Sequence, residues 1–453
     1  MAWHMMDNFF YLSLFFVLAM LIKRTVPHLQ RFIIPNAILA GFIGLVLGPS
    51  LLNLIPLQLE RLGDIIYHLM AVGFIGLSLK KVNTDRSRNS ANAGFVIVSA
   101  YLVQGIFGFL LTLCWNAFDK GVSPLMGLFL PLGYGQGPGQ AFSLGSQWEE
   151  LGMSNGAAIG LTVAAAGFVW ATIGGIIVLN FVLKRDNGFE RNPIMEKAEV
   201  VVKDFEFPSM DGATIQIVFI GAIYFGVYAL LTGITRLLSP LGDFGRTLAT
   251  MLWGFHFVFG ALAGLTVRHI YNGLLRRGIV REDYLNNFLL QRISGGVFDF
   301  MVAAAISAVS FARVSDVFIP LLTLTLLGGV LTYAYLSFVV PKAFPENSKT
   351  NLIAMFGMLT GTISTGIALL REVDPGMETG AADNLVLGSG VAIGLGLPLM
   401  VLLNVPVMAF ISGQYSYNLV FLALMIVYGL LMGLLWAKKL VPEPHEGEIS
   451  SST

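Results

Sequence analysis

The sequence predicts an all-α polytopic membrane protein, and three observations lead to that prediction. The chain has 453 residues, of which 55% are hydrophobic and 12% are charged, whereas an ordinary soluble domain is about 25% charged. Its apolar residues gather in runs of about 20, which is long enough for a helix to cross the hydrocarbon core. Its 51 glycines would let such helices approach one another closely. This composition excludes a soluble globular enzyme, a disordered protein and a free nucleic-acid binder.

Eleven apolar runs are expected to cross the membrane as helices, and none has the alternating pattern of a β-strand. In the first half of the chain they lie at about 8–22, 33–48, 62–79, 93–117 and 155–183. In the second half they lie at about 213–235, 245–267, 293–312, 317–340 and 382–412. An extra span follows at about 417–436.

Two further apolar stretches, at about 122–148 and 350–372, are each broken near the middle by glycine and small polar residues. Such a stretch suits a re-entrant hairpin, whose non-helical tip must lie within protein or line a wet cavity, because lipid cannot satisfy bare backbone groups. With both stretches re-entrant and the N-terminus outside, 22 of the 27 basic residues fall on the inner side. This asymmetry follows the positive-inside rule and predicts that the C-terminus lies inside.

The order of the spans predicts two inverted-topology repeats, each made of five transmembrane helices and one re-entrant hairpin. An odd number of spans makes the two halves enter the membrane from opposite sides, which is a frequent build for secondary transporters. The segment 152–158 matches 376–382 at five of seven positions, with an offset of 224, and the same offset places Gly137 on Gly361.

This repeat divides the chain into five predicted segments. They are a first repeat at 1–183, a cytoplasmic linker at 184–212, a second repeat at 213–412, an extra transmembrane helix at 413–441 and a disordered cytoplasmic tail at 442–453.

The first broken stretch carries the tip Gly133-Tyr134-Gly135-Gln136-Gly137-Pro138-Gly139-Gln140. Glycines let a backbone approach a ligand closely, and the helix that follows would point its free N–H groups and its positive dipole end back at the tip. A substrate carboxylate would be favoured there, and unwound carbonyls could ligate sodium. A kink used only for packing is the alternative, but it would not need two glutamines. The predicted binding residues are Gly135, Gln136, Gly137, Gly139 and Gln140.

The second broken stretch carries the tip Thr360-Gly361-Thr362-Ile363-Ser364-Thr365-Gly366. Its hydroxyl and backbone groups could bind either a carboxylate or a cation. The alternative is that the hydroxyls bond to carbonyls of their own helix. The predicted binding residues are Thr360, Gly361, Thr362, Ser364 and Thr365.

Asp299 and Asn404 are the predicted sodium ligands within the spans. Ionisable groups are unfavourable inside a membrane, so Asp299 is a candidate for function. It could ligate a cation or carry a proton, or it could only form a pair near the cytoplasmic end of its span. Asn404 is uncharged and could offer its amide oxygen. No cofactor is expected besides the transported ion, and the single cysteine, Cys114, excludes a cysteine-ligated metal site.

Taken together, these features resemble the bacterial sodium/glutamate symporter family over about residues 30–412. The residues that carry the resemblance are Ile33-Ile34-Pro35, Asp64 followed by Ile75-Gly76-Leu77, the glycine-rich tip followed by Gly152-Met153-Ser154-Asn155, and the span ending at Asn404. The chain departs from the family pattern at the start of the first tip, which is usually Gly-Gly-His-Gly. It also departs at Thr362 and Ser364, where glycines are common, and at Val401, where an acidic residue is usual.

The resemblance implies sodium-coupled import of glutamate across the bacterial cytoplasmic (inner) membrane. The family is similar in architecture to the 2-hydroxycarboxylate transporters, and that similarity implies a homodimer with an elevator-like motion. The first two helices of each repeat would form the static scaffold, and the other helices and both hairpins would form the mobile carrier. The implied partners are glutamate or a related anion, sodium, membrane lipid and a second copy of the chain, but no nucleic acid.

Three alternatives are weighed against this expectation. A carrier of the same build could transport another amino acid or organic anion and could use sodium or protons. An ion channel is a remote alternative, because Gly133-Tyr134-Gly135 matches only part of the potassium-filter pattern T-V-G-Y-G. The chain has one such copy where a filter needs four. An intramembrane enzyme is disfavoured because no catalytic motif is found.

Overall fold

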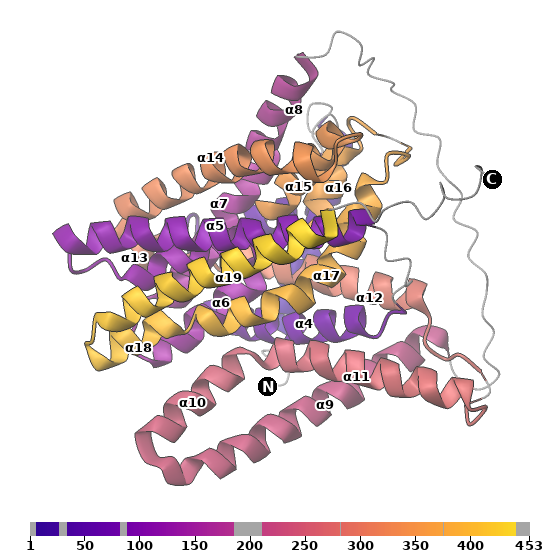
Figure 1. The fold of residues 1–453 in the computed structure, drawn as a ribbon, viewed down its shortest axis with the longest axis horizontal. Coiled ribbons are helices and arrows are strands. Elements are labelled where there is room, and N and C mark those ends of the chain that lie inside the picture. Colours follow the sequence, from indigo (N-terminus) through magenta and orange to yellow (C-terminus); the bar gives the residue numbers. More distant parts are fainter. Residues whose placement is uncertain are drawn as a thin grey trace, which may run out of the picture.

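The computed structural model describes residues 6–26, 34–81, 88–184, 211–280, 282–374 and 376–440, and every regular element in these ranges is helical. The predicted all-α class is therefore confirmed for the described residues. Most of the long helices lie roughly along the longest axis of the molecule (Figure 1). The predicted linker and C-terminal tail lie almost wholly outside the described residues.

The first half of the chain begins with four long elements. They are α1 (Asp7–Thr25), α3 (Asn36–Leu47), α4 (Leu59–Ser78) and α5 (Arg88–Phe118). A 3₁₀ turn η2 (Pro124–Leu128), a π-helical segment η3 (Leu130–Gln136) and helix α6 (Pro138–Glu150) make the first broken stretch. After them come α7 (Gly156–Val169), a π-helical segment η4 (Trp170–Gly174) and α8 (Gly175–Lys184).

The second half of the chain contains more breaks between helices. Its first elements are α9 (Gly212–Leu238), η5 (Ser239–Leu241), α10 (Gly242–Gly254), α11 (His256–Arg276) and α12 (Asn287–Ser307). Next come α13 (Phe311–Val314), η6 (Ser315–Val317), α14 (Phe318–Ala343) and the second broken stretch, α15 (Ser348–Leu359) with α16 (Ile363–Leu370). The chain ends with α17 (Ala381–Leu402), α18 (Val405–Ser412) and α19 (Ser416–Leu440).

Within the described chain, eight helices are long and apolar enough to cross a membrane, or nine if α10 and α11 form one bent span. This finding supports a polytopic membrane protein, with fewer qualifying helices than the eleven predicted spans. Two of the predicted spans, at 33–48 and 62–79, do not qualify. The first is α3, which has 12 residues and is about 18 Å long. The second is α4, whose first turns carry charged side chains.

One predicted span, at 245–267, is not continuous. It bends by 63° between α10 and α11, next to Gly254. Such a break frees carbonyl groups that must find other donors. The hydroxyl of Tyr67 donates to the carbonyl of Trp253 at 2.9 Å, and the hydroxyl of Ser143 donates to that of Gly254 at 2.8 Å. Tertiary contacts therefore stabilise a break that apolar periodicity could not reveal.

The buried apolar side chains form three clusters. The largest joins α5, the first broken stretch, α7, α14, the second broken stretch, α17 and α19. A second is centred on α1, α3, α4 and α12, and a third joins α4, α9, α11 and α12. Figure 1 shows α9, α10 and α11 along one edge of the molecule, apart from α5, α14 and α19. Helices α4 and α12 thus lie between the two sides, and they also pack against each other.

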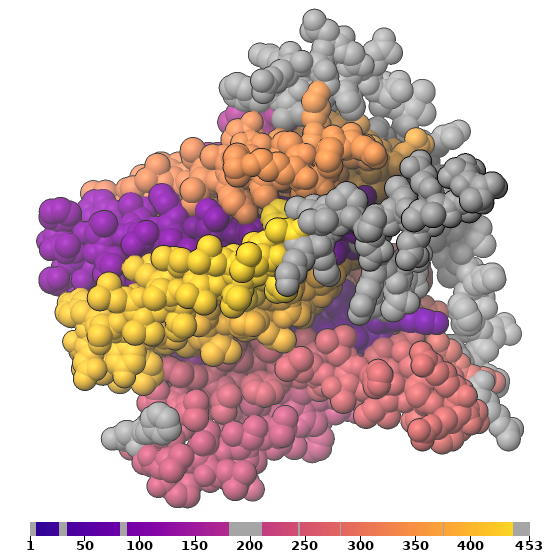
Figure 2. All heavy atoms as spheres, viewed as in Figure 1, coloured from indigo at the N-terminus to yellow at the C-terminus, as the bar shows by residue number. Residues whose placement is uncertain are grey.

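The outer surface is strongly apolar, as expected for helices that face lipid. Figure 2 shows α19 lying along one face of the molecule, beside α17 and α18. Leu419 on α19 is 69% exposed and Phe225 on α9 is 71% exposed, and many large apolar side chains of both helices are also exposed. Exposed leucine and phenylalanine along whole helices agree with a membrane-embedded surface.

Both predicted broken stretches are interrupted at the expected residues. In the first, η3 ends at Gln136 and α6 begins at Pro138, with Gly137 between them at a φ of 103°. In the second, α15 ends at Leu359 and α16 begins at Ile363, and the two helices pack against each other. Glycine suits the first break because side chains rarely tolerate a positive φ.

Candidate functional site

The two broken tips approach the same two residues of the bundle, Gln104 on α5 and Gly167 on α7. The carboxamide nitrogen of Gln104 donates to the carbonyl of Leu359, immediately before the second tip, at 3.1 Å. The oxygen of the same carboxamide lies 2.9 Å from where a Cβ on Gly135, in the first tip, would stand. Gln104 is thus placed between the two tips.

Gln104 is almost fully buried, with 1% of its side chain exposed. Besides Leu359, its nitrogen donates to the hydroxyl of Thr332 on α14 at 2.9 Å. Its oxygen is buried and has no hydrogen-bond partner among the described residues. A buried acceptor without a donor is unfavourable by about 1–3 kcal/mol, so this oxygen can accept a hydrogen bond that no described residue donates.

Gly167 provides the second point of contact. A Cβ at this position would lie 2.5 Å from the carbonyl oxygen of Thr360 and 2.8 Å from the ring of Tyr134. The hydroxyl of Tyr134 donates to the carbonyl of Thr325 on α14 at 2.7 Å, and the indole of Trp170 donates to the same carbonyl at 3.0 Å. Any residue larger than glycine at 167 would push the two tips apart. The hydrogen bond from Tyr134 holds the first tip against α14.

The first tip keeps polar groups and space that are free for a ligand. The carboxamide nitrogen of Gln136 is buried and has no partner among the described residues. A Cβ on Gly137 would meet no atom within 4 Å, so open space lies beside the backbone there. The 13 residues of α6 begin at this point, and a helix of that length directs its unpaired N–H groups and positive dipole end at the tip. The tip can therefore attract an anion.

The other predicted residues of the first tip have mixed roles. Gly135 lies against Gln104 and Tyr101, and a Cβ added to it would stand 2.5 Å from the Tyr101 ring. Gly139 instead lies against the sulfur atoms of Met70 on α4 and Met301 on α12, so its small size serves helix packing. Gln140 is buried in the first turn of α6, and no hydrogen bond of its side chain is found within the described chain.

The second tip uses most of its hydroxyl groups on its own backbone. Thr362 caps α16 through a reciprocal pair with Thr365, whose hydroxyl also donates to the carbonyl of Gly357 at 2.6 Å. The hydroxyl of Thr360 donates to the carbonyl of Phe356 at 2.7 Å. Gly361 lies against the Thr365 hydroxyl, and Ser364 is exposed. The alternative in which these hydroxyls bond to their own helix therefore holds for Thr360 and Thr365.

The two predicted sodium ligands do not join this site directly. The amide oxygen of Asn404 accepts a hydrogen bond from the indole of Trp148 at 3.3 Å, and its nitrogen donates to the carbonyl of Met400 at 3.2 Å. Trp148 lies ten residues along α6 from its start, which is about 15 Å from the tip. Asp299 lies on α12 and has no hydrogen bond to a described residue, and Met301, two residues further on, reaches Gly139. Helix residues two positions apart face different sides, so this contact does not bring the exposed side chain of Asp299 to the first tip.

Sequence reasoning missed Gln104, Tyr134 and Gly167 as members of the site. One signal could have indicated Gln104, since it is a polar residue near the middle of the 31-residue apolar helix α5. Gly167 gave no such signal among the many glycines of the chain. Within the described residues, no group of three or more histidine, cysteine, aspartate or glutamate side chains could hold a metal. A cation here would be ligated mainly by backbone, amide and hydroxyl oxygens.

Comparison with known proteins adds no relative: the chain matches no protein-family model and no curated protein.

Proposed function

We propose that this protein is a sodium-coupled secondary transporter that imports glutamate, with an inverted-repeat, elevator-type mechanism. The observation that carries the proposal is the meeting of two broken tips at Gln104 and Gly167, inside a bundle of apolar helices. Non-helical backbone at membrane depth is tolerated only where it lies within protein or lines a cavity. Discontinuous helices of this kind form the midplane binding sites of many carriers.

Helix boundaries support the proposed internal repeat. With the sequence offset of 224, α16 and α17 start within one residue of the positions that correspond to the starts of α6 and α7. The turn before each of the later helices is held by a carboxylate. Glu149 accepts from the backbone N–H of Ala157 at 3.0 Å, and Asp374 accepts from those of Glu378 and Thr379, each at 3.0 Å.

Helix packing supports the same pairing of the halves. Helix α3 packs against α12, and its counterpart α11 packs against α4, the counterpart of α12. Each half therefore packs one of its helices against the same counterpart helix of the other half, as expected if an approximate two-fold axis relates the halves. The clusters also suggest a larger scaffold than the resemblance implies, because α4 and α12 share buried clusters with the first helices of each half.

In the proposed mechanism, a substrate carboxylate binds at the start of α6, where N–H groups and the helix dipole favour negative charge. The free carboxamide nitrogen of Gln136 donates to it. Sodium binds near by, where the unpartnered oxygen of Gln104 is available, and Asp299 is a further candidate ligand. Each ligand then strengthens binding of the other, and linkage makes this coupling reciprocal.

The direct test is uptake of radiolabelled glutamate into proteoliposomes, with and without an inward sodium gradient and with protein-free liposomes as control. Uptake that requires the gradient is the expected result. Folded protein without uptake under either condition would contradict glutamate as the substrate. A panel of amino acids and organic anions, tested with sodium and then proton gradients, would separate the other-carrier alternative. Ion flux without substrate would indicate the channel alternative.

A further inference from the structure

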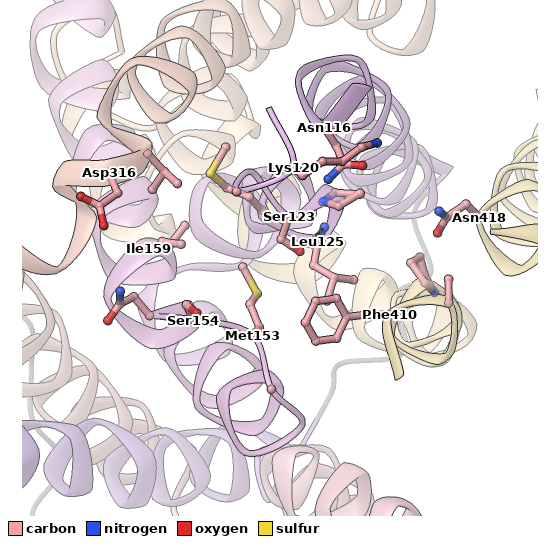
Figure 3. A pocket seen from close by; sticks show the side chains of 18 of the residues that line it. Asn116, Lys120, Ser123, Leu125, Met153, Ser154, Ile159, Asp316, Phe410 and Asn418 are labelled. Atoms are coloured by element: carbon pink, nitrogen blue, oxygen red, sulfur yellow. Dashed lines mark hydrogen bonds between the residues drawn. The ribbon is translucent and has the colours of Figure 1, made fainter. Parts of the chain in front are cut away.

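An open cavity of about 730 Å³ lies away from the tips, at the end of the bundle where α5 ends and α7 and α19 begin. The start of the first broken stretch and the loop between α6 and α7 line it, together with the segment before α14 and with α18. Figure 3 shows Leu125, Met153, Ile159 and Phe410 around its middle, with Asp316 on one side and Asn418 on the opposite side. This end of the bundle is the predicted outer side.

One buried polar group at the cavity has no hydrogen-bond partner in the part of the chain that the structure describes. Asn418, in the first turn of α19, is 6% exposed, and its amide oxygen makes no hydrogen bond to any described residue. Asn116 is also buried at the wall, where its nitrogen donates to the carbonyl of Val122 at 2.8 Å. A buried acceptor of this kind is unfavourable unless a donor reaches it. The Asn418 oxygen therefore points to a ligand that carries hydroxyl or N–H groups.

The charged side chains of the cavity favour an anion that also donates hydrogen bonds. Lys120 and Arg313 line it and are exposed, so both can turn toward a bound phosphate. Asp316 is the one carboxylate among the lining residues, and it accepts a hydrogen bond from Ser315 at 3.2 Å. Two cations, one carboxylate and the amide oxygen of Asn418 suit a phosphate ester with free hydroxyl groups.

The position of the cavity favours a lipid over a free solute. Most of its lining is apolar. Tyr415, which lines it, is 63% exposed, and Phe118, which lies between the lining residues Asn116 and Lys120 in the sequence, is 91% exposed. Aromatic side chains at the ends of membrane helices mark the depth of lipid headgroups. Leu419, one turn along α19 from Tyr415, continues the exposed apolar surface along which an acyl chain could lie.

We propose that this cavity binds the headgroup of an anionic phospholipid with free hydroxyls, such as phosphatidylglycerol. The phosphate binds Lys120 and Arg313, and the headgroup hydroxyls donate to Asn418 and Asp316. The acyl chains lie on Phe410 and the exposed face of α19. This site does not depend on the proposed transport activity, so either proposal can fail alone.

The test titrates the purified full-length chain in detergent with phosphatidylglycerol, and native mass spectrometry counts the bound lipid. The double variant Lys120→Gln with Arg313→Gln is compared with Arg236→Gln, an exposed cation on α9 that is not part of the cavity. A cation near a lipid surface contributes about 1 kcal/mol, or about fivefold in affinity. The double variant should therefore bind about 25-fold more weakly, and Arg236→Gln should bind as the unmodified chain does.

Three results would overturn the proposal. One is equal affinity of the unmodified chain and the double variant for phosphatidylglycerol. Another is equally tight binding of phosphatidylcholine, which lacks a net charge and headgroup hydroxyls. The third is full competition by glycerol phosphate at equal concentration, which would assign the cavity to a free anion. If the double variant does not fold, Asn418→Leu takes its place, and its unchanged affinity would count equally against the site.

Discussion

The two broken tips meet in the fold, but they differ in whether their polar side chains are already hydrogen-bonded within the protein. At the first tip, the carboxamide nitrogen of Gln136 is buried without a partner in the described chain, and open space lies beside Gly137. At the second tip, the hydroxyls of Thr362 and Thr365 cap α16 and bond to the backbone. The first tip thus has unused binding capacity, whereas the second is stabilised by its own side chains.

This difference indicates that the first tip binds the ligand and that the capping side chains of the second tip stabilise the fold. A group that remains unpaired in the protein can gain a full hydrogen bond from a ligand, but a capping hydroxyl must give up an existing bond to do so. We therefore expect substitutions of Gln136 at the first tip to change transport, and substitutions of the capping threonines at the second tip to change stability. Gln104, which contacts both tips, should affect transport most.

The largest expected effect is that of Gln104→Leu. This change removes the donor to Leu359 and Thr332 and leaves two buried acceptors without it, which costs about 1–3 kcal/mol for each. Uptake of glutamate should fall at least about tenfold, measured in proteoliposomes at matched protein density. Thr332→Val, which removes only one of the two acceptors, serves as the control and should have a smaller effect. Equal uptake by Gln104→Leu and the unmodified chain would remove Gln104 from the site.

The next effect is that of Gln136→Leu. Its nitrogen has no partner in the described chain, so its loss removes no bond within the protein and should leave the Tm unchanged or slightly higher. KM for glutamate should rise about tenfold if this nitrogen donates to the charged carboxylate, since such bonds contribute about 1.5–3 kcal/mol. A lower Tm with unchanged KM would mean that Gln136 has a structural role instead.

Thr365→Val should have the reverse profile. It removes the capping bond and the bond to Gly357, and loss of a cap lowers stability by about 1 kcal/mol. Thermal unfolding should show a lower Tm, whereas KM in the folded fraction should change less than about threefold. Thr365→Ser retains the hydroxyl and should restore most of the stability. A large KM change without a Tm change would contradict the contrast between the tips.

Ser364→Ala tests whether the second tip also contacts the ligand. Ser364 is exposed, and it is the serine of a tip whose threonine hydroxyls are engaged in capping. We expect uptake to weaken by about two- to fivefold, the value of one neutral hydrogen bond, without loss of expression. Unchanged uptake in both Ser364→Ala and Gln136→Ala would contradict the placement of the substrate between the tips.

The smallest expected effect concerns Asp299→Asn, which keeps the shape of the side chain and removes its charge. If Asp299 is a cation or proton site, the sodium or pH dependence of uptake should shift while maximal uptake stays within about threefold. The measurement is uptake at graded sodium concentrations and at several pH values. An unaltered dependence on both would leave Asp299 with a structural role.

Sequence reasoning could predict the membrane class and both breaks because composition and glycine-rich interruptions are local signals. Gly137 and Gly361 mark tips that the structure places where expected. The bend after Gly254 could not be predicted in this way, because the donors that satisfy it, Tyr67 and Ser143, lie far away in the sequence. Tertiary contacts decide such breaks, and apolar periodicity does not report them.

The same limit applied to the candidate site. Residue type alone suggested that every hydroxyl of the second tip could bind a ligand, but capping uses Thr362 and Thr365. The position of Asn404 in a span predicts a sodium ligand, yet its amide is hydrogen-bonded to Trp148 and Met400. The role of Gln104 could not be predicted from the sequence, because it depends on the fold, which places α5 between two tips that are distant in the sequence.

The central claim is that the two tips enclose one ligand, and cysteine protection tests it most directly. Cys114 would be replaced by serine, and Gln136→Cys, Ser364→Cys and the control Ser239→Cys, exposed in η5 between α9 and α10, would then be made one at a time. Maleimide labelling of each variant, active in uptake, would be followed with and without glutamate and sodium. We expect the ligands together to slow labelling at 136 and 364 and to leave labelling at 239 unaffected. Equal labelling rates at 136 and 364 with and without the ligands, in protein that transports glutamate, would contradict it.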